Sequence, residues 1–515
     1  MTSMTESRRR LFRQDHPRYR WVALSNTTLG MLMASVNSSI VIISLPAIFD
    51  GIGLRPLDPG NVSYLLWMLM GYLVVTAVFV VTFGRLGDQY GRVRIYNLGF
   101  VVFAVSAVAL SLDPFRSGAG ATWLIAWRVV QGIGGAMITA NSTAILTDAF
   151  PAEKRGLALG TNQVAAIGGS FIGLVVGGVL SAIDWHWVFL VSVPFGVIGT
   201  IWSYLSLHEI GTRNPGRVDW PGNITFAVGL IVLLTAITYG IQPYGGSPVG
   251  WTSPWVLSGI ALGVLLLVAF VLIEQRSSHP MFALPLFRIR AFTLANLAGL
   301  LTAIGRGGLQ FILIIWLQGI WLPLHGYSYE STPLWAGIYL LPLTIGFLIS
   351  GPISGALSDR VGARFFSTTG LLLMAATFVL LLLLPVDFAY PWFALITFLN
   401  GIGNGMFASP NRTAVMNSVP ANQRGSASGL SGTLQNSGTA LSIGVFFSLL
   451  IAGLAASLPA VMRSGLTAHG VAPAIADRVA QTPPVGSLFA ALLGYNPIGH
   501  PGAAKGHAID EARPP

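Results

Sequence analysis

The sequence predicts an all-α protein that crosses a membrane many times, and its charge and hydropathy patterns carry this prediction. Asp, Glu, Lys and Arg make up only 9% of the 515 residues, whereas a soluble domain has about 25%. Apolar residues reach 53% and form blocks of about 20 residues, the length at which a helix crosses the bilayer core. Inside that core every backbone polar group must be bonded within the protein, which favours helices. The alternative, one very large soluble core, is disfavoured by the shortage of charge.

Thirteen apolar runs are predicted to span the membrane. They are 22–49, 64–83, 95–112, 122–147, 157–183, 186–207, 222–241, 255–273, 292–320, 335–357, 366–384, 391–417 and 427–456.

The first five runs are separated by short polar segments. The basic segment 1–21 precedes the first run, which is too long for the apolar part of a cleavable signal. The second and third runs carry no charge and flank GRLGDQYGRVR (84–94), a predicted loop with four charges and three glycines. The fourth and fifth runs are rich in glycine, which membrane helices tolerate, and flank DAFPAEKRG (148–156).

The remaining eight runs complete the predicted organisation. The run 186–207 ends a first group of six, and the next two runs lie in a linker, 208–291. Two later runs flank a second charged segment, GALSDRVGAR (355–364). Residues 457–515 are predicted to form a polar extracytoplasmic tail, because GSLFAALLGY (486–495) is too short to cross.

Lys and Arg collect in alternate connections, which predicts a cytoplasmic N-terminus and a multi-pass protein of the plasma membrane. The predicted outer connections before the tail hold only Arg55 and Arg116. The inner side holds Arg8, Arg9, Arg10, Arg13, Arg18, Arg20, Arg85, Arg92, Arg94, Lys154, Arg155, Arg213, Arg217, Arg276, Arg288, Arg290, Arg360, Arg364 and Arg424. The net charge of +10 is therefore a topology signal that also favours contact with anionic membrane lipids, and nucleic acid is not an expected partner.

Several kinds of chemistry are excluded by residue type. The chain has no cysteine, and its eight histidines show no metal-ligand spacing, so neither a metal nor a cofactor is expected. The two lysines, Lys154 and Lys505, do not complete a phosphate-binding loop, which excludes an ATP motor on this chain. No titratable pair or activated nucleophile lies within the spans, so we do not expect an enzyme.

An internal repeat divides the chain into two related halves. GIGGAM (132–137) recurs as GIGNGM (401–406), 269 positions later, and the charged segment 84–94 recurs at an offset of 271. The second offset aligns Asp88 with Asp359 and Gly91 with Gly362. We therefore predict a six-span half (22–207) and a five-span half (292–456). Parallel repeats of this kind place a substrate cavity between the halves and permit alternating access.

Four ordered motifs resemble those of the major facilitator superfamily, and specifically its 14-span drug:proton antiporters. Gly84, Leu86, Asp88, Gly91 and Arg92 match the G-x-L-x-D-x-x-G-R signature between spans two and three. RVVQGIGGA (128–136) is similar to the fourth-span motif, and GLVVGG (173–178), with Gly173, Gly177 and Gly178, to the fifth-span antiporter motif. WHWVFLVSVPFG (185–196) resembles a W-x-W-x-F-x-x-N-x-P-x-G segment, with Ser192 replacing Asn. The resemblance implies a major facilitator fold in which the last family span is missing.

The resemblance implies a gating contact between the halves. Asp88 matches the family aspartate that meets the N-terminus of a helix in the opposite half, where the helix dipole favours an anion. That helix is expected to begin near Gly425, and Asp359 is expected to reciprocate near Gly156. The predicted latch comprises Gly84, Asp88, Gly91, Arg92, Asp359, Arg360 and Gly362. A solvated turn that serves topology alone is the alternative.

Polar residues within the spans are candidates for coupling or substrate binding, because charges are costly there. Arg128 matches the family arginine implicated in proton coupling, and Gln131 lies one turn away. Arg306 is expected to face the cavity with Gln310, whereas Arg412 is expected to snorkel to the surface. Structural pairing is the alternative for Arg128 and Arg306.

Proton coupling is left open by the first span. It reads VNSSIVIISLP, with Asn37 where the antiporter family has an aspartate, and Asp148 at a span end is the acidic residue nearest the interior. The leading hypothesis is a secondary active transporter of the plasma membrane that exports amphipathic small molecules such as drugs. The alternatives are an exporter of lipids or other solutes with weak or no proton coupling, and a non-transporting receptor or scaffold derived from a transporter. Substrate identity and oligomeric state are not indicated.

Overall fold

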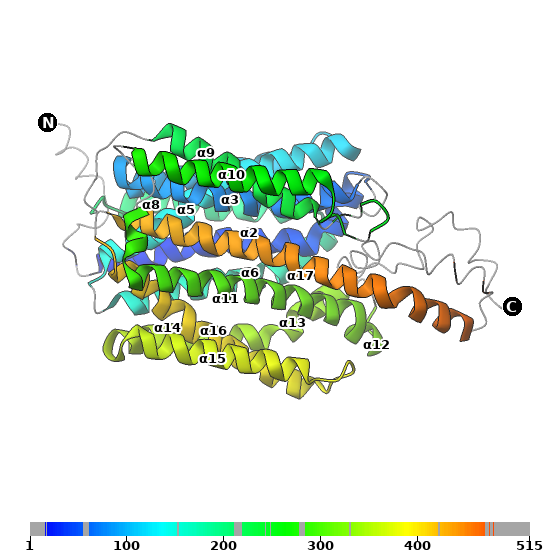
Figure 1. Cartoon of the computed structure of the whole chain (residues 1–515). Helices are drawn as coiled ribbons and strands as arrows, with labels where there is room; N and C mark the ends of the chain where they lie inside the picture. The colour runs from blue at the N-terminus through cyan, green and yellow to red at the C-terminus, as the bar shows by residue number, and fades with distance from the viewer. Residues whose placement is uncertain are drawn as a thin grey trace.

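The computed structural model is a bundle of long helices that run roughly along one axis (Figure 1). It describes residues 16, 18–54, 61–151, 154–210, 219–240, 242, 244–247, 249–277, 284–328, 331–420, 423–468, 473 and 477. Within these residues the only β-structure is an isolated bridge between Tyr244 and Ser247.

The helices follow one another in the order predicted from the apolar runs. They are α2 (Tyr19–Gly51), α3 (Val62–Tyr90), α4 (Arg92–Ser111), α5 (Ser117–Ala149), α6 (Arg155–Ile183), α7 (His186–Leu190), α8 (Ser192–Ser206), α9 (Trp220–Tyr239), α10 (Pro254–Arg276), the 3₁₀ turn η3 (Leu284–Arg288), α11 (Arg290–Trp316), the π turn η4 (Leu317–Trp321), α12 (Leu322–Leu324), α13 (Thr332–Tyr339), α14 (Leu341–Val361), α15 (Ala363–Leu382), α16 (Tyr390–Asn417) and α17 (Arg424–Ala468).

Twelve helical stretches of the described residues are long and apolar enough to cross a membrane. The remaining predicted span, 391–417, is also helical: it is α16, which packs along α14 and α15 and is longer than either. Its buried face is rich in polar residues, among them Asn400, Asn404 and Arg412, which lowers its average apolarity. The all-helical membrane fold is therefore confirmed.

The prediction that residues 84–94 form a loop was wrong, because most of this segment is helical. Helix α3 continues through Arg85 and Asp88 to Tyr90, and α4 begins at Arg92, so the whole turn is made at Gly91. Gly91 has φ +117°, a conformation that side-chain-bearing residues rarely adopt. The repeat reproduces this device at Gly362, with φ +100°, between α14 and α15. The charged side chains are consequently held on rigid helix ends.

Three predicted spans are interrupted near prolines, which cannot donate a backbone hydrogen bond. The span 186–207 is divided into α7 and α8 at Val191, three residues before Pro194. The span 335–357 is divided into α13 and α14 at Leu340, two residues before Pro342. The span 292–320 passes through η4 into α12, which contains Pro323.

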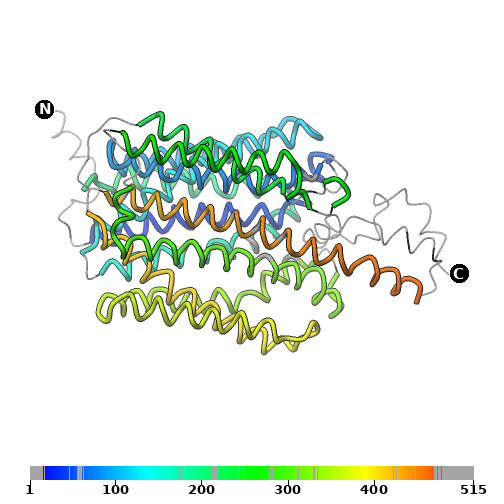
Figure 2. Tube along the Cα trace, viewed as in Figure 1, coloured from blue at the N-terminus to red at the C-terminus, as the bar shows by residue number. Residues whose placement is uncertain are grey.

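The two predicted halves contact each other most extensively through two helix pairs. Helix α17 packs along α3, and α14 packs along α6. Gly429 lets α17 approach α3, since a Cβ there would lie 2.8 Å from the Val81 Cα atom. The linker helices α9 and α10 pack on each other, and α9 also contacts α3. Figure 2 traces these neighbours from blue to red along the chain. The proposed domain boundaries stay predictions.

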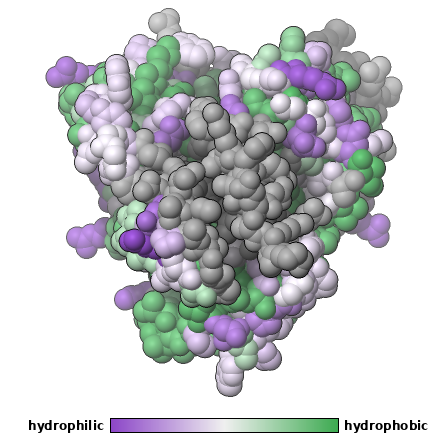
Figure 3. Space-filling model, turned by 90° about the vertical axis from the view of Figure 1, so that its right-hand side faces the viewer, coloured by the Kyte–Doolittle hydropathy of each residue, from purple (hydrophilic) through white to green (hydrophobic). Residues whose placement is uncertain are grey.

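The bundle has two distinct ends. We call one end the arginine-rich face; there α2 begins and α3 ends, on the left in Figure 1. Its described basic residues are Arg18, Arg20, Arg85, Arg92, Arg94, Lys154, Arg155, Arg276, Arg288, Arg290, Arg360, Arg364 and Arg424. Figure 3 looks onto the opposite end, where hydrophilic and hydrophobic residues are interspersed. Between the ends, large apolar side chains such as Leu265 and Leu372 are two-thirds exposed, as expected for a lipid-facing surface.

Helix α17 continues beyond the predicted last span. It extends twelve residues past 456, to Ala468, and projects from the bundle at the end opposite the arginine-rich face (Figure 1). The extension includes Ala460, Met462 and Arg463, good helix formers that allow the helix to continue past Pro459. The segment 486–495 lies outside the described residues.

Candidate functional site

A cluster of opposite charges lies at the arginine-rich face, where α3 and α5 end and α4 begins. Arg92 Nε and Nη2 donate hydrogen bonds to Asp88 Oδ1 at 2.9 and 2.7 Å. Arg92 Nη1 forms an ion pair with Asp148 at the end of α5. Asp88 and Arg92 are only 1% and 4% exposed. The sequence indicated Arg92 as a topology charge and latch residue, but its burial against two carboxylates could not be inferred from spacing.

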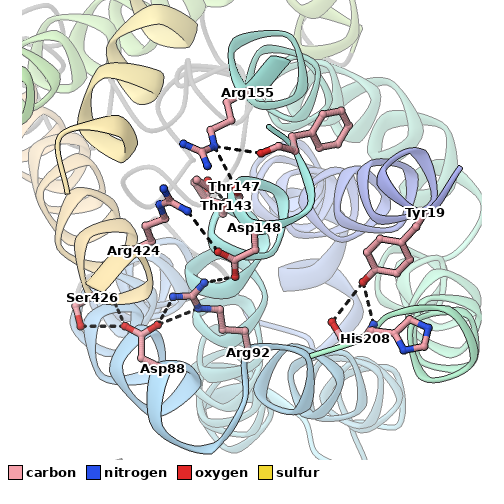
Figure 4. Close-up of polar contacts among 11 residues, drawn as sticks. Tyr19, Asp88, Arg92, Thr143, Thr147, Asp148, Arg155, His208, Arg424 and Ser426 are labelled. Atoms are coloured by element: carbon pink, nitrogen blue, oxygen red, sulfur yellow. Dashed lines mark hydrogen bonds and ion pairs between the residues drawn. The ribbon is translucent and has the colours of Figure 1, made fainter. Parts of the chain in front are cut away.

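This cluster reaches across to the other half through the first turn of α17. The Ser426 backbone N–H donates to Asp88 Oδ2 at 2.9 Å, and the Ser426 hydroxyl lies 3.2 Å from the same oxygen. Arg424 Nη1 is 3.7 Å from Asp148 Oδ1. Figure 4 shows the side chains converging from both halves. We call Asp88, Arg92, Asp148, Arg424 and Ser426 the first polar cluster.

The contact between Asp88 and a helix start near residue 425 is the one predicted from the sequence. The start of α17 carries partial positive charge, and Asp88 places a carboxylate against it. The two carboxylates of the first polar cluster are balanced by two guanidinium groups. A buried arrangement of this kind is sensitive to loss of any one member, because the remaining charge is left uncompensated. The gating role of the cluster stays a prediction.

A second, weaker cluster occupies the repeat-related position. The Gly156 backbone N–H donates to Asp359 Oδ1 at 3.2 Å, and its carbonyl accepts from the Ser409 hydroxyl at 3.1 Å. Arg155 Nη1 donates to Asn417 Oδ1 at 2.9 Å. We call Gly156, Asp359, Ser409, Arg155 and Asn417 the second polar cluster. It too joins the halves, through α6 on one side and α14 and α16 on the other.

The two clusters differ at two repeat-related positions. Asn417 stands at the position equivalent to Asp148, and Ala363 at the position equivalent to Arg92. Arg155 and Arg424 are likewise equivalent, so one arginine meets an amide and the other a carboxylate. The second cluster therefore repeats the helix-start contact without the charged pair.

The other predicted latch residues have separate positions. Gly91 and Gly362 make the two turns, and Gly84 lies within α3. Arg360 is exposed and forms no hydrogen bond or ion pair with the described residues. Gly87 was not identified from the sequence as a contact residue. A Cβ at this position would overlap the side-chain oxygen of Asn141, so glycine is needed for α5 to pack this close to α3. Asp148, a candidate from the sequence for proton coupling or the substrate cavity, lies in the first polar cluster, and its role in coupling stays a prediction.

Arg128 lies at the centre of a second group of predicted residues, inside the first half. Its Nη1 donates to Asn37 Oδ1 at 2.5 Å and to Gln131 Oε1 at 2.9 Å. Its guanidinium also lies 4.8 Å from the centre of the Tyr72 ring. Arg128 is 1% exposed, and its Nε has no hydrogen-bond partner in the described part of the chain. This buried cation is therefore held by amides and a ring.

The two departures from the family motifs meet beside Arg128. Asn37 Nδ2 lies 3.4 Å from the Ser192 hydroxyl, so the residue that replaces an aspartate contacts the residue that replaces an asparagine. Both side chains are buried. The sequence showed each substitution, but their proximity across 155 positions required the fold.

Arg306 and Gln310 lie one turn apart on α11 and are half-buried. Leu309 and Leu313, on the same side of the helix as Arg306, pack in a cluster that includes Ile167 of α6. Arg306 therefore lies on the side of α11 whose leucines pack in this cluster. Its predicted role in a cavity stays a prediction.

Arg412 does not snorkel as expected. It is 8% exposed and joins the two halves, donating from Nη2 to the Thr143 hydroxyl of α5 at 2.9 Å. Its Nη1 lies 3.4 Å from Gln435 Oε1 on α17. The expectation was wrong because α5 and α17 cover this end of α16, which a single-helix argument cannot foresee.

The glycines of the fifth-span motif bring α6 close to α2. A Cβ on Gly173 would meet the Val36 carbonyl, and one on Gly177 would lie 2.8 Å from the Ile40 carbonyl. The Ser44 hydroxyl donates to the Gly177 carbonyl at 3.2 Å. Gly178 faces Leu334 of α13 at an ordinary contact distance of 3.7 Å, so it is turned towards the other half.

The described residues contain no group of three His, Cys, Asp or Glu side chains that could hold a metal ion. What this site offers is a set of polar contacts between two halves, together with three arginines inside the bundle.

Comparisons with known proteins agree with this architecture. The model of the Major Facilitator Superfamily matches residues 27–222 and 216–443. The riboflavin transporter RibZ of Clostridioides difficile is 28% identical over 84% of this chain and 89% of its own.

Two further comparisons extend the likeness. The methyl viologen resistance protein SmvA of Salmonella typhimurium is 30% identical over 88% of this chain and 87% of its own. The solved proton:xylose symporter XylE has a TM-score of 0.56 at 16% identity, over 92% of this chain and 95% of its own, and shares the fold. The chain belongs to the Major Facilitator Superfamily.

Proposed function

We propose that the protein is a secondary transporter of the plasma membrane that exports amphipathic small molecules by alternating access. In this proposal the arginine-rich face is cytoplasmic, as the distribution of Lys and Arg favours. The family membership and the relatives named as transporters or resistance proteins support transport in general.

The observation that carries the mechanism is the placement of the polar contacts between the halves. Asp88 with Ser426, Asp359 with Gly156, and Arg412 with Thr143 all lie towards the arginine-rich face. Such contacts hold that face closed. Their rupture would let the halves rock apart there, because each contact joins a helix of one half to a helix of the other.

Export with weak or absent proton coupling is the form of this function that the first half favours. A carrier of protons must titrate, and Asn37 contributes an amide to Arg128 where a carboxylate is found in the resembling antiporters. Lipids and other solutes remain alternative cargoes, and a receptor or scaffold without transport is the alternative function.

Flux in proteoliposomes tests this proposal. Purified protein is reconstituted, a pH gradient is imposed, and release of neutral, cationic and anionic amphipaths is followed with and without a protonophore. We expect substrate-dependent flux that the protonophore leaves nearly unchanged. Flux that collapses with the protonophore would contradict weak coupling, and absence of any substrate-dependent flux would favour the receptor or scaffold.

The Asn37→Asp variant sharpens the coupling test. A carboxylate next to Arg128 would introduce a titratable group into the first half, so we expect flux to acquire a pH dependence that the parent chain lacks. Asn223→Asp is the matched control, because Asn223 is a buried asparagine on the linker helix α9 that contacts Thr82. The same pH dependence in both variants would contradict a special role for position 37.

A further inference from the structure

The interior of the bundle carries positive charge without matching negative charge. Arg128, Arg306 and Arg412 all lie more than a helical turn from the ends of their helices. By the rise of an α-helix, Arg306 is about 24 Å along α11 from the arginine-rich face. The net charge inside the membrane is therefore set by arginine.

The described acidic residues do not enter this region. Each lies within three residues of a helix end, in a connection, or beyond the last helix. They are Asp50, Asp88, Asp113, Asp148, Asp184, Glu209, Asp219, Glu274, Asp359, Asp387 and Asp477. No ion pair joins a described carboxylate to any of the three interior arginines. Compensation of their charge must come from neutral dipoles or from a bound anion.

The three arginines differ in how many hydrogen-bond partners their guanidinium groups have among the described residues. Arg128 is enclosed by two amides and a ring inside one half, and Arg412 bonds Thr143 and Gln435. Arg306 forms no hydrogen bond or ion pair with the described residues, and it is only half-buried. It therefore retains donors and access.

The surroundings of Arg306 suit an amphipathic ligand. Gln310 provides a second polar group one turn away, and the partly buried Leu309 provides an apolar side chain on the same side. A fixed guanidinium binds a carboxylate, phosphate or sulfonate through paired hydrogen bonds. The same charge repels a cation in a medium of low polarity.

We propose that the transported solute, or the part of it that enters the space between the halves, is an anion that Arg306 binds. The proposal rests on the proposed transport function and deepens it by giving the substrate class: amphipathic anions, with a free solute or an anionic lipid headgroup as the source. Arg412 and Arg128 add positive potential without direct contact.

A matched series of probes tests the charge preference in the unmodified chain. Pyrenebutyrate, pyrenebutanol and a pyrenebutyl trimethylammonium salt share one apolar group and differ in charge. Binding is measured by fluorescence anisotropy with the full chain in nanodiscs of zwitterionic lipid. We expect the anion to bind at least about tenfold more tightly than the cation. Equal binding, preference for the cation, or binding of none of the probes would overturn the proposal.

Variants on α11 test the assignment to Arg306. Arg306→Gln should weaken pyrenebutyrate about 10- to 100-fold, the range for loss of hydrogen bonds to a charged group, and leave pyrenebutanol within about twofold. Arg306→Lys should retain most of the preference. Arg290→Gln is the control, because Arg290 is exposed at the start of the same helix. An unchanged anion affinity in Arg306→Gln would overturn the assignment.

Two further experiments are needed. The first distinguishes a lipid headgroup from a free solute as the natural anion, and the second distinguishes failure of the anion site from failure of the proposed transport. Phosphatidylglycerol added to the nanodiscs should displace pyrenebutyrate if a lipid headgroup is the natural anion, and should leave it bound if a free solute is. Flux of the three probes in proteoliposomes is measured in parallel. Anion binding without flux would refute the proposed transport and leave the anion site standing. Flux of the cation in preference to the anion would refute the anion site and leave transport standing.

Discussion

The two polar clusters occupy equivalent places in the two halves, but they are built differently. In the first, the carboxylate against the helix start is buried and shares Arg92 with Asp148. In the second, Asp359 is partly exposed, and the positions equivalent to Arg92 and Asp148 are Ala363 and Asn417. Both clusters have the glycine turn and the helix-start contact, but only the first adds a buried network of charges. The first cluster is therefore expected to dominate the closed state of the arginine-rich face.

The largest expected effect follows from removing the shared carboxylate. Asp88→Asn leaves Arg92 buried with only Asp148 and weakens the contact to Ser426. Breaking a buried ion pair costs about 3–5 kcal/mol, so we expect transport to fall at least tenfold and the midpoint of thermal unfolding to drop by several degrees. Asp387→Asn, on an exposed connection, is the control. Parent-like rates in Asp88→Asn would show that the first cluster does not gate.

A smaller effect is expected from rebuilding the missing charges in the second cluster. The double variant Ala363→Arg with Asn417→Asp copies the first arrangement and places a carboxylate beside Arg155. A well-formed partly buried pair should stabilise the closed face by about 1 kcal/mol, which slows transport severalfold. The two single variants are the controls for the double variant, because an added charge without its partner should not stabilise the closed face. Equal effects of the single and double variants would argue against the equivalence.

The smallest effect is expected from Asp359→Asn. The lost interaction is mainly that of a partly exposed carboxylate with the start of α6, worth about 0.3–1 kcal/mol. We expect transport to change less than about fivefold, measured beside Asp88→Asn in the same vesicles. An effect as large as that of Asp88→Asn would remove the asymmetry between the clusters.

Accessibility of position 306 supplies a prediction outside the clusters. The chain has no cysteine, so Arg306→Cys carries a single thiol. We expect aqueous thiol reagents to label it when the halves open, and more rapidly in the presence of Asp88→Asn if they enter from the arginine-rich face. Gly308→Cys, where Phe446 crowds the backbone, is the protected control. No labelling of position 306 in any condition would contradict a polar cavity there.

Much of the fold follows from short-range features of the sequence. Apolar length marks the helices, and Gly91 and Gly362 mark the tight turns, because both properties are local. The contact of Asp88 with the start of α17 was predictable only through a family resemblance. The ion pair between Arg92 and Asp148 and the bridge from Arg412 to Thr143 were not predictable, because they depend on how helices far apart in sequence pack. Helix breaks at Val191 and Leu340 lie near prolines that membrane helices often accommodate without a break.

Distance measurements between spin labels at the arginine-rich face test the central claim most directly. Arg94→Cys on α4 and Arg364→Cys on α15 place labels on exposed positions of opposite halves. We predict that Asp88→Asn shifts the population towards longer distances, whereas Asp359→Asn shifts it little and Asp387→Asn not at all. A distance distribution that is the same in Asp88→Asn as in the parent chain would contradict the claim that the first polar cluster holds the two halves together at this face.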